Sequence, residues 1–392
     1  MKVSFNLQTI CSLEELPSSV RKTIFLAGPC PRNDASLSWH PEALSILEGL
    51  GYDGAVIVPM YRDGKNVEFD LEAQTQWEQK MMDAADCIVF WVPRKFRPDF
   101  EMIGLTTNVE FGRYFATGKC VAGAPLDAEK TEYLKVISKD TVKWHDTLED
   151  TLEAAVDFVG DGVYREGVET TVPQHIFVSE QFQNWYGFLK KAGNRLENFR
   201  MLYNFFMPIQ KKLFLAIWKP SVFISDENRT KEIEFVVGRT DISHILAYYP
   251  AEDMMSSKIV LVEEFRSPVA NANGKVFELP GGSSLKPNVS PNVTARDELE
   301  EETGLSVSPD RFSMVAAKQS AATLCSHRAW LFCIELTEDE ISSLEQDDSV
   351  HGNVEDTERT YVHVVSVREA LSVMDWTNSG MVLQGLSAVF RS

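Results

Sequence analysis

Three glutamates, Glu298, Glu301 and Glu302, stand at positions i, i+3 and i+4 of one short segment. On a helix of roughly 100° per residue they fall within an arc of about 60–100°, so the three carboxylates face one point. Like charges this close raise one another's pKa unless a cation lies between them. Carboxylate oxygens suit Mg²⁺ or Mn²⁺, ions that also hold water and substrate phosphates. The spacing therefore predicts a metal site that handles phosphate.

The flanking residues predict the helix that would carry these glutamates. Ser290 is a candidate N-cap, Pro291 fits the first helical position, and Gly304 follows the last turn, where a left-handed residue is favoured. A helix over about 291–303 is expected. The alternative is an ordinary acidic helix face in solvent, which is the usual meaning of a glutamate run.

Together with Glu278-Leu279-Pro280-Gly281-Gly282, this segment resembles the Nudix box of the Nudix hydrolases. The matching positions at its end are Glu298, Leu299, Glu301, Glu302, Gly304 and Leu305. Asp297 occupies the arginine position, the spacer after Gly282 is one residue too long, and the upstream glutamate position falls on Asn288 or Val289. The resemblance implies a Mg²⁺ or Mn²⁺ ion bound by Glu298 and Glu302, with Glu301 as a third carboxylate that serves the metal or the catalysis. Arg296 is left open as a substitute for the missing arginine, although its direction differs by about 100°.

Strand-like patterns precede the box. Residues 231–241 alternate, and residues 258–268 form a β-branched run that ends at the proline after Arg266-Ser267. This order resembles the ADP-ribose pyrophosphatase branch of the Nudix hydrolases, over about 216–390. It implies that metal-activated water hydrolyses a diphosphate linked to a nucleoside, with Arg266 in substrate binding. The base would lie on a loop after the box, where Glu355, Asp356 and Glu358 are the candidates; an ordinary acidic loop is the alternative for each.

A second pattern occupies the N-terminal third. Short apolar runs at 23–27, 55–59, 87–93 and 119–123 alternate with helical patterns at about 41–50, at about 70–85 and from about 108. Buried strands that alternate with helices predict an α/β fold with a doubly wound parallel sheet, of the flavodoxin-like class. Ligands of such sheets bind beyond the carboxyl ends of the strands, so the polar residues there are the candidates.

Several sequence segments in this region resemble the nucleoside 2-deoxyribosyltransferase-like family, over about 20–160. They are Phe25-Leu26-Ala27-Gly28-Pro29, Gln76-Trp77-Glu78 and the segments 84–94 and 106–112. The resemblance implies that Glu110 attacks the anomeric carbon of a nucleoside and that Asp86 lies near the leaving base. Such a pair supplies a nucleophile and a proton donor, as in glycoside hydrolysis. The alternative for Glu110 is a charge that complements the helix dipole.

Substrate contacts are predicted at Gly28, Arg32, Trp77, Arg94 and Asn108. Arg32 and Arg94 would hold a phosphate through bidentate contacts, and Trp77 would stack on a base. Surface arginines and a core tryptophan are the alternatives.

Composition favours small-molecule nucleotide or nucleoside substrates. The 392 residues carry a formal net charge of −20, which argues against nucleic acid or an anionic membrane as partner, because their phosphates would be repelled. Six cysteines without Cys-x-x-Cys spacing indicate reduced thiols. We see no secretory segment or long apolar span, so a cytoplasmic location is expected.

Four segments are predicted: a loosely attached leader at 1–18, the deoxyribosyltransferase-like domain at 19–164, a helical connector at 165–215, and a Nudix-type domain with a mixed sheet between helical layers at 216–392. The connector is rich in aromatic and basic residues. Packing on a domain or on a second subunit would explain them, and a homodimer is left open. Binding of a nucleobase or a phosphate is the alternative.

These patterns predict a two-site enzyme of nucleotide metabolism. One site would cleave or exchange an N-glycosidic bond, and the other would hydrolyse a diphosphate such as ADP-ribose. Two alternatives stay open: a nucleotide sensor whose variant box binds without turnover, and a protein in which the N-terminal site alone is catalytic.

Overall fold

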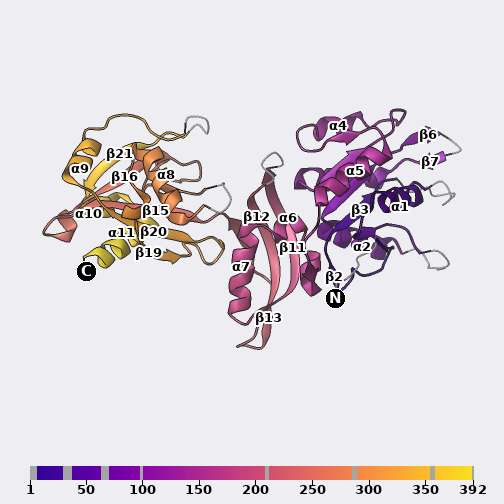
Figure 1. Cartoon of the computed structure of the whole chain (residues 1–392), viewed down its shortest axis with the longest axis horizontal. Coiled ribbons are helices and arrows are strands. Elements are labelled where there is room, and N and C mark those ends of the chain that lie inside the picture. The colour runs from indigo at the N-terminus through magenta and orange to yellow at the C-terminus, as the bar shows by residue number, and fades with distance from the viewer. Residues whose placement is uncertain are drawn as a thin grey trace. The chain divides into compact units, whose positions relative to one another are not determined.

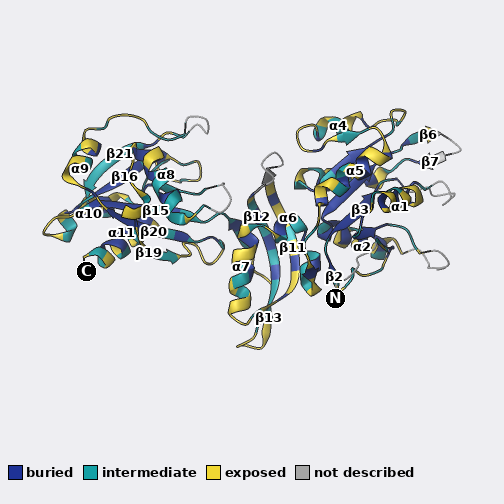
Figure 2. Cartoon of the chain, in the orientation of Figure 1, coloured by how far each residue is buried: buried dark blue, intermediate teal, exposed yellow. Residues whose placement is uncertain are grey.

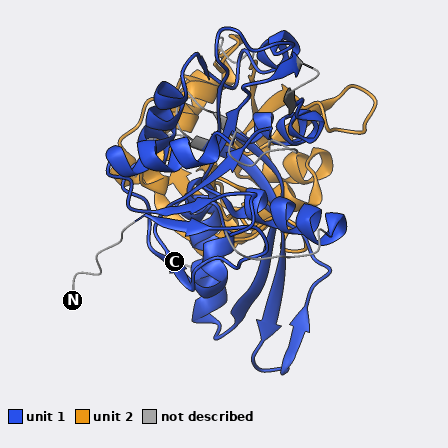
Figure 3. Cartoon of the chain, turned by 90° about the vertical axis from the view of Figure 1, so that its right-hand side faces the viewer, with its two compact units in different colours: residues 1–237 blue, residues 238–392 orange. Residues whose placement is uncertain are grey.

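The computed structural model describes residues 7–29, 38–62, 70–97, 100–207, 212–284, 289–353 and 358–390. The chain forms two compact units, Met1–Val237 and Gly238–Ser392 (Figure 1, Figure 3). The boundary between them lies beyond the predicted one at 215/216, because the strand that crosses that position belongs to the first unit.

Unit 1 begins with a parallel sheet. In its described part the strand order is β1 (Gln8–Ile10), β4 (Ala55–Ile57), β3 (Thr23–Ala27), β5 (Cys87–Trp91), β8 (Cys120–Gly123) and β9 (Trp144–His145), and all neighbours are parallel. Every residue of β3 and β5 is buried, because helices cover both faces (Figure 2). The predicted parallel sheet is confirmed. The strand order reverses between β3 and β5, which is where ligands bind in such folds.

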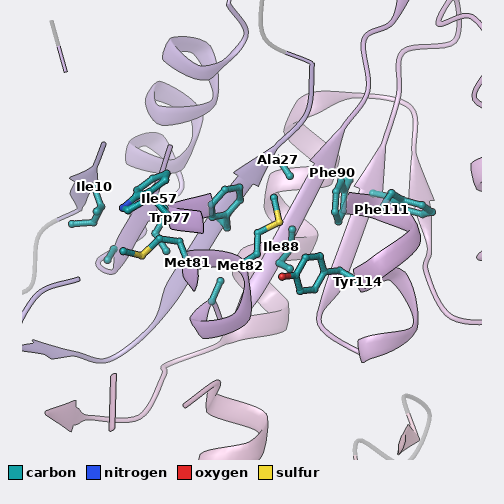
Figure 4. Packing of buried hydrophobic residues seen from close by; sticks show 14 of the residues in the cluster. Ile10, Ala27, Ile57, Trp77, Met81, Met82, Ile88, Phe90, Phe111 and Tyr114 are labelled. Atoms are coloured by element: carbon teal, nitrogen blue, oxygen red, sulfur yellow. The ribbon is translucent and has the colours of Figure 1, made fainter. Parts of the chain in front are cut away.

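Two helical layers cover this sheet. α1 (His40–Gly49) and α5 (Leu148–Val159) pack on one face, and α2 (Leu71–Ala84), α3 (Leu105–Tyr114) and α4 (Glu132–Ile137) pack on the other. In the second layer, Met82 of α2 and Phe111 of α3 lie in one cluster with Phe90 of β5 (Figure 4). A hairpin of β6 (Lys95–Arg97) and β7 (Phe100–Met102) precedes α3. The short η2 (Phe115–Thr117) follows it.

Residues 8–18 belong to unit 1, so the predicted loose leader is wrong for them. Gln8 of β1 pairs with Ala55 of β4, and Ile10 is buried in the core. The following β2 (Ser19–Val20) pairs with β10 (Arg165–Glu166). A strand as short as β1 carries too few residues to show an alternating pattern. Residues 1–6 lie outside the described residues.

The predicted helical connector at 165–215 is helical only in its first half. η3 (Gly167–Thr171), α6 (Gln174–Phe177) and α7 (Glu180–Lys191) are followed by an antiparallel ribbon of β11 (Arg195–Met207) and β12 (Lys212–Ile224). β13 (Arg229–Lys231) and β14 (Val236–Arg239) pair with β12. Register shifts at 196–198 and 201–203 break the alternation that marks a strand. For this reason the periodicity of the sequence does not reveal β11.

Unit 2 is a mixed sheet between two helical layers. Its strand β15 (Ile242–Tyr249) pairs in parallel with β20 (Ala329–Glu335) and antiparallel with β16 (Lys258–Phe265). The described sheet also contains β17 (Lys275–Glu278), β18 (Gly281–Gly282), β19 (Ser313–Lys318) and β21 (Tyr361–Ser366). α8 (Pro291–Thr303) and α9 (Glu338–Glu345) cover one face, and α10 (Val367–Val373) and α11 (Trp376–Val389) cover the other. The short η4 (Met254–Ser256) and η5 (Pro309–Arg311) lie in loops.

The helix predicted over 291–303 is confirmed as α8. Ser290 is extended (φ −73°, ψ 146°), Pro291 is the first helical residue, and Gly304 ends the helix with a φ of 70°. A positive φ at that position favours glycine, which explains the clear end of the pattern.

Among the described residues, every helix is too short or too polar to traverse a bilayer. The five described cysteines, Cys11, Cys87, Cys120, Cys325 and Cys333, are free thiols. Cys30 lies outside the described residues.

Candidate active site

Two glutamates on neighbouring helices form the centre of the candidate site in unit 1. Glu110 lies on α3 and Glu78 on α2, and both are partly buried. Burial, followed by the charge of Glu78, raises the pKa of Glu110 to about 7. Burial also raises the pKa of Glu78. The charge of one carboxylate thus favours the protonated form of the other, as expected for a carboxyl pair that takes part in acid–base chemistry.

A chain of polar side chains extends from Glu78 to the N-terminal segment. The Gln74 amide donates to Glu78 Oε1 at 2.7 Å, and the Ser12 hydroxyl donates to Gln74 Oε1. Ser12 and Gln74 are buried. The amide therefore fixes the orientation of Glu78. Sequence reasoning missed all three residues, although the i, i+4 spacing of Gln74 and Glu78 indicates a shared helix face.

Gly28 follows β3 at the point where the strand order reverses. A Cβ at this position would overlap the Trp91 carbonyl oxygen and lie 2.9 Å from the Trp39 ring. The close approach of β3 and β5 therefore requires glycine here. Sequence reasoning assigned Gly28 to substrate binding; the structure shows this packing role.

Arg94 and Asn108 hold the beginning of α3. The Arg94 guanidinium donates to the carbonyls of Lys130 at 3.1 Å and Gly104 at 3.2 Å, and to Asn108 Oδ1 at 2.5 Å. Arg94 is buried, and Gly104 precedes the helix in the left-handed conformation. Both residues were predicted to bind substrate. Their contacts instead position the helix that carries Glu110.

Asp86 lies at the amino end of β5, whereas ligands of this fold bind at the carboxyl ends. Arg165 donates to its Oδ1 at 2.8 Å and to its Oδ2 at 2.5 Å. The backbone N–H groups of Thr23 and Gln174 also donate to it, at 2.8 and 2.6 Å. The predicted proton-donor role is not supported, because these donors occupy both oxygens. The sequence places Asp86 directly before a strand, but it does not show the pairing with Arg165, which lies 79 positions later.

Trp77 is a core residue, as its alternative interpretation stated. Its side chain is 6% exposed and packs near Phe25, with ring centroids 6.5 Å apart. Its ring N–H donates to the Glu14 carbonyl at 2.6 Å. These contacts leave no free face for the predicted base stacking. Arg32 lies outside the described residues.

Residues 21–128 match the family described as nucleoside 2-deoxyribosyltransferase like. This segment forms a deoxyribosyltransferase-like domain. It contains strands β3 to β8 and both glutamates of the candidate site. The match indicates an enzyme-like domain in the first part of the chain. No curated protein matches the chain.

Unit 2 has its own group of glutamates, beside the turn at Gly281-Gly282. The Gly281 N–H donates to Glu302 Oε2 at 2.8 Å, and a Cβ on Gly282 would overlap the Glu298 carboxylate. Burial, with the charges of Glu301 and Glu358, raises the pKa of Glu298 to about 7. Burial also holds the pKa of Glu302 well above its ordinary value. A cation at this place would stabilise the charged forms of both groups.

Arg266 lies within an acidic cluster next to these glutamates. Its guanidinium is 2.8 Å from Glu264, 3.2 Å from Glu278 and 3.8 Å from Glu358. Burial raises the pKa of Glu264 to about 7, although Arg266 opposes this shift. Glu358 raises the pKa of Glu302, so the two clusters adjoin. Sequence reasoning found Arg266 and Glu358 but missed Glu264, which precedes the arginine by two positions in the same segment.

The carboxylate oxygens of these glutamates are suitable ligands for Mg²⁺ or Mn²⁺. Within the described ranges, however, no group of three or more His, Cys, Asp or Glu side chains is arranged to hold an ion. Glu301 is exposed, and Glu355 and Asp356 lie outside the described residues. Metal binding by Glu298, Glu301 and Glu302 stays a prediction.

Arg296 does not take the place of the arginine that the predicted Nudix box lacks. Its Nε donates to Asp297 Oδ1 at 2.7 Å. The two residues thus form a local ion pair on α8, and the glutamates are left without a nearby arginine from this helix.

Proposed function

We propose that the deoxyribosyltransferase-like domain cleaves or exchanges the N-glycosidic bond of a nucleoside or nucleotide. The pair of partly buried glutamates, Glu78 and Glu110, supports this proposal. The Glu110 carboxylate attacks the anomeric carbon, and the electron pair of the C–N bond goes to the base nitrogen. A glycosyl ester results. Water or a second base then attacks the same carbon and releases Glu110.

Glu78 moves the proton in this scheme. When Glu110 is ionised and Glu78 holds the proton, Glu78 protonates the departing base, and in the second step it accepts a proton from the incoming water or base. The Gln74 amide keeps its carboxyl group in one orientation. This assignment replaces Asp86, whose oxygens are occupied by Arg165.

Release of free base from a panel of nucleosides and nucleotides, measured by chromatography in EDTA, tests the proposal. Glu110→Ala is expected to abolish release, and Glu78→Gln to reduce it by about 10²- to 10⁴-fold, the usual contribution of acid–base catalysis. The control is Glu153→Gln, at an exposed glutamate of α5. Full base release by Glu110→Ala on every substrate, or sensitivity to EDTA, would contradict this mechanism.

We propose a second activity for unit 2: Mg²⁺- or Mn²⁺-dependent hydrolysis of a nucleoside diphosphate-linked compound such as ADP-ribose. The adjacent glutamates Glu298 and Glu302, beside Gly281-Gly282, support it. A bound ion would supply charge stabilisation at phosphorus and an activated water. Glu298 and Glu302 would hold the ion, with Glu301 as the third carboxylate.

Two further residues complete this second proposal. Glu358 would accept the proton of the attacking water, and Arg266 would bind the diphosphate through its planar guanidinium. The two side chains are 3.8 Å apart, so a base and a phosphate ligand are available next to the glutamates of α8.

The alternative for unit 2 is a sensor that binds nucleotide without turnover, which the pairing of Arg296 with Asp297 favours. Hydrolysis of ADP-ribose with Mg²⁺ or Mn²⁺ separates the two. Glu302→Gln is expected to reduce hydrolysis by at least roughly 10²-fold, while Glu338→Gln, at an exposed glutamate of α9, leaves it unchanged. Binding of ADP-ribose without turnover by any divalent ion, and indifference to Glu302→Gln, would establish the sensor.

A further inference from the structure

A cavity of about 260 Å³ lies in unit 1, near the amino ends of β5 and β8. Its lining comes from the end of α2, from the end of α3 through Lys119, and from residues 200–204 of β11. Asn204 of β11 donates to the Thr117 carbonyl at 2.8 Å and so ties the ribbon to this end of the domain. Glu78 and Glu110 are not among the described lining residues.

The cavity is cationic in a strongly acidic chain. Arg113, Lys119 and Arg200 line it, and Asp83 is the one carboxylate among its described lining residues, whereas the chain as a whole carries −20. His175 also lines it, but burial lowers the pKa of this imidazole to about 3, so it is neutral. A local excess of positive charge attracts an anionic ligand.

The two arginines are placed to contact such an anion. Arg113 is only loosely paired, with its Nη2 3.5 Å from both oxygens of Asp83. Arg200 is exposed, and in the described part of the chain its guanidinium has no hydrogen bond or ion pair. A planar guanidinium matches the oxygens of a phosphate group.

Lys119 would attract the anion by its charge, because its N–H groups already donate to backbone carbonyls. Its Nζ donates to the carbonyls of Met82, Asp83 and Ala85 at 2.6, 2.8 and 3.0 Å. Burial lowers its pKa to about 8, so it remains largely protonated near neutral pH. An anion in the cavity would favour the charged form further.

The size and polarity of the cavity limit the ligand. A volume of about 260 Å³ is below the roughly 300–1,000 Å³ of sites for larger ligands. The Asp83 carboxylate would repel a bare anion. Its Oδ1 accepts a hydrogen bond from the Tyr114 hydroxyl at 2.6 Å, and its second oxygen can accept one from a hydroxyl group of the ligand. We propose that this cavity binds a small organic phosphate that carries hydroxyl groups, of the size of a pentose phosphate.

Isothermal titration calorimetry on the full chain with ribose 5-phosphate, inorganic phosphate and ribose tests this proposal. Ribose 5-phosphate is expected to bind saturably, inorganic phosphate at least about 10-fold more weakly, and ribose not at all. Arg200→Ala should weaken the binding of ribose 5-phosphate by at least about 10-fold, through loss of a charge-assisted contact. Arg195→Ala, at an exposed arginine of the same strand β11, should leave the Kd unchanged.

Two further variants distinguish this cavity from the candidate active sites. Glu110→Gln and Arg266→Ala are both expected to retain the wild-type Kd for ribose 5-phosphate. Absence of saturable binding, equal effects of Arg200→Ala and Arg195→Ala, or loss of binding in Arg266→Ala would each overturn the site. Inorganic phosphate that binds as tightly as ribose 5-phosphate would overturn the assignment to a hydroxylated ligand.

Discussion

Arg165 binds both carboxylate oxygens of Asp86 in an ion pair whose side chains are 0% and 1% exposed. Asp86 precedes β5 of the parallel sheet, and Arg165 lies in β10, beyond the last helix that covers the sheet. The pair therefore joins two segments that are distant in the sequence. Its role is structural.

Removal of one partner should destabilise unit 1. Asp86→Ala is expected to lower the free energy of unfolding by about 3–5 kcal/mol, because it leaves a buried guanidinium without its counter-charge. Denaturation in urea, followed by circular dichroism, measures the change. Asp53→Ala is the control, since Asp53 pairs with Lys22 but is 44% exposed and should cost less than about 1 kcal/mol. An Asp86→Ala protein of wild-type stability that has lost base release would restore the proton-donor interpretation.

The raised pKa of Glu110 predicts how stability depends on pH. Below its ordinary pKa of 4.5, Glu110 is protonated in both the folded and the unfolded chain. As the pH rises, the unfolded chain loses this proton first, and the stability that Glu110 contributes is lost as the pH passes through about 7. Glu110→Gln should therefore gain stability over the wild type at about pH 8 relative to about pH 5, as seen in denaturation midpoints. The same pH dependence in Glu110→Gln and wild type would refute the shift; Glu153→Gln serves as the control.

Gly28→Ala tests the close approach of β3 and β5. The new Cβ would meet the Trp91 carbonyl oxygen, and a backbone atom cannot turn away as a side chain can. We expect a loss of about 1–3 kcal/mol in the free energy of unfolding. Gly49→Ala, near the end of α1 with nothing within 4 Å of its added Cβ, should instead be neutral or stabilise by up to about 1 kcal/mol. Equal effects of the two substitutions would argue against the packing role.

Gly282→Ala tests the metal proposal for unit 2. The added methyl would displace the carboxylate of Glu298, which is the end of a flexible side chain, so the fold should survive. Mn²⁺ affinity, measured by electron paramagnetic resonance, is expected to fall by at least about 10-fold. Gly380→Ala, in α11 with no atom near its added Cβ, should leave the affinity unchanged. Unaltered Mn²⁺ binding in Gly282→Ala would show that Glu298 is not a ligand of the ion.

Local signals in the sequence predicted α8 and the parallel sheet well. The proline and glycine at the ends of α8 act within a few residues, and the buried strands of unit 1 are apolar on both faces. β11 was missed because its bulges disturb the alternation. The periodicity of a bulged strand resembles that of neither a regular strand nor a helix.

The candidate site was harder to predict, because its contacts join residues that are distant in the sequence. Asp86 lies next to a strand of the parallel sheet, as ligand-binding residues of such sheets do. Only its pairing with Arg165, 79 residues later, shows its structural role. Glu78 gains its importance from Glu110 on another helix. Neither the Asp86–Arg165 pair nor the Glu78–Glu110 pair has a residue spacing that can be recognised in the sequence.

The strand β1 also satisfies backbone groups of the parallel sheet. It covers the outer edge of β4, whose other edge is occupied by β3. A shortened chain that starts at residue 19 would expose the unpaired N–H and C=O groups of β4 to other molecules. Such a bare edge is a template for intermolecular strand pairing. Residues 8–10 thus give β4 a backbone partner from the same chain on its outer side.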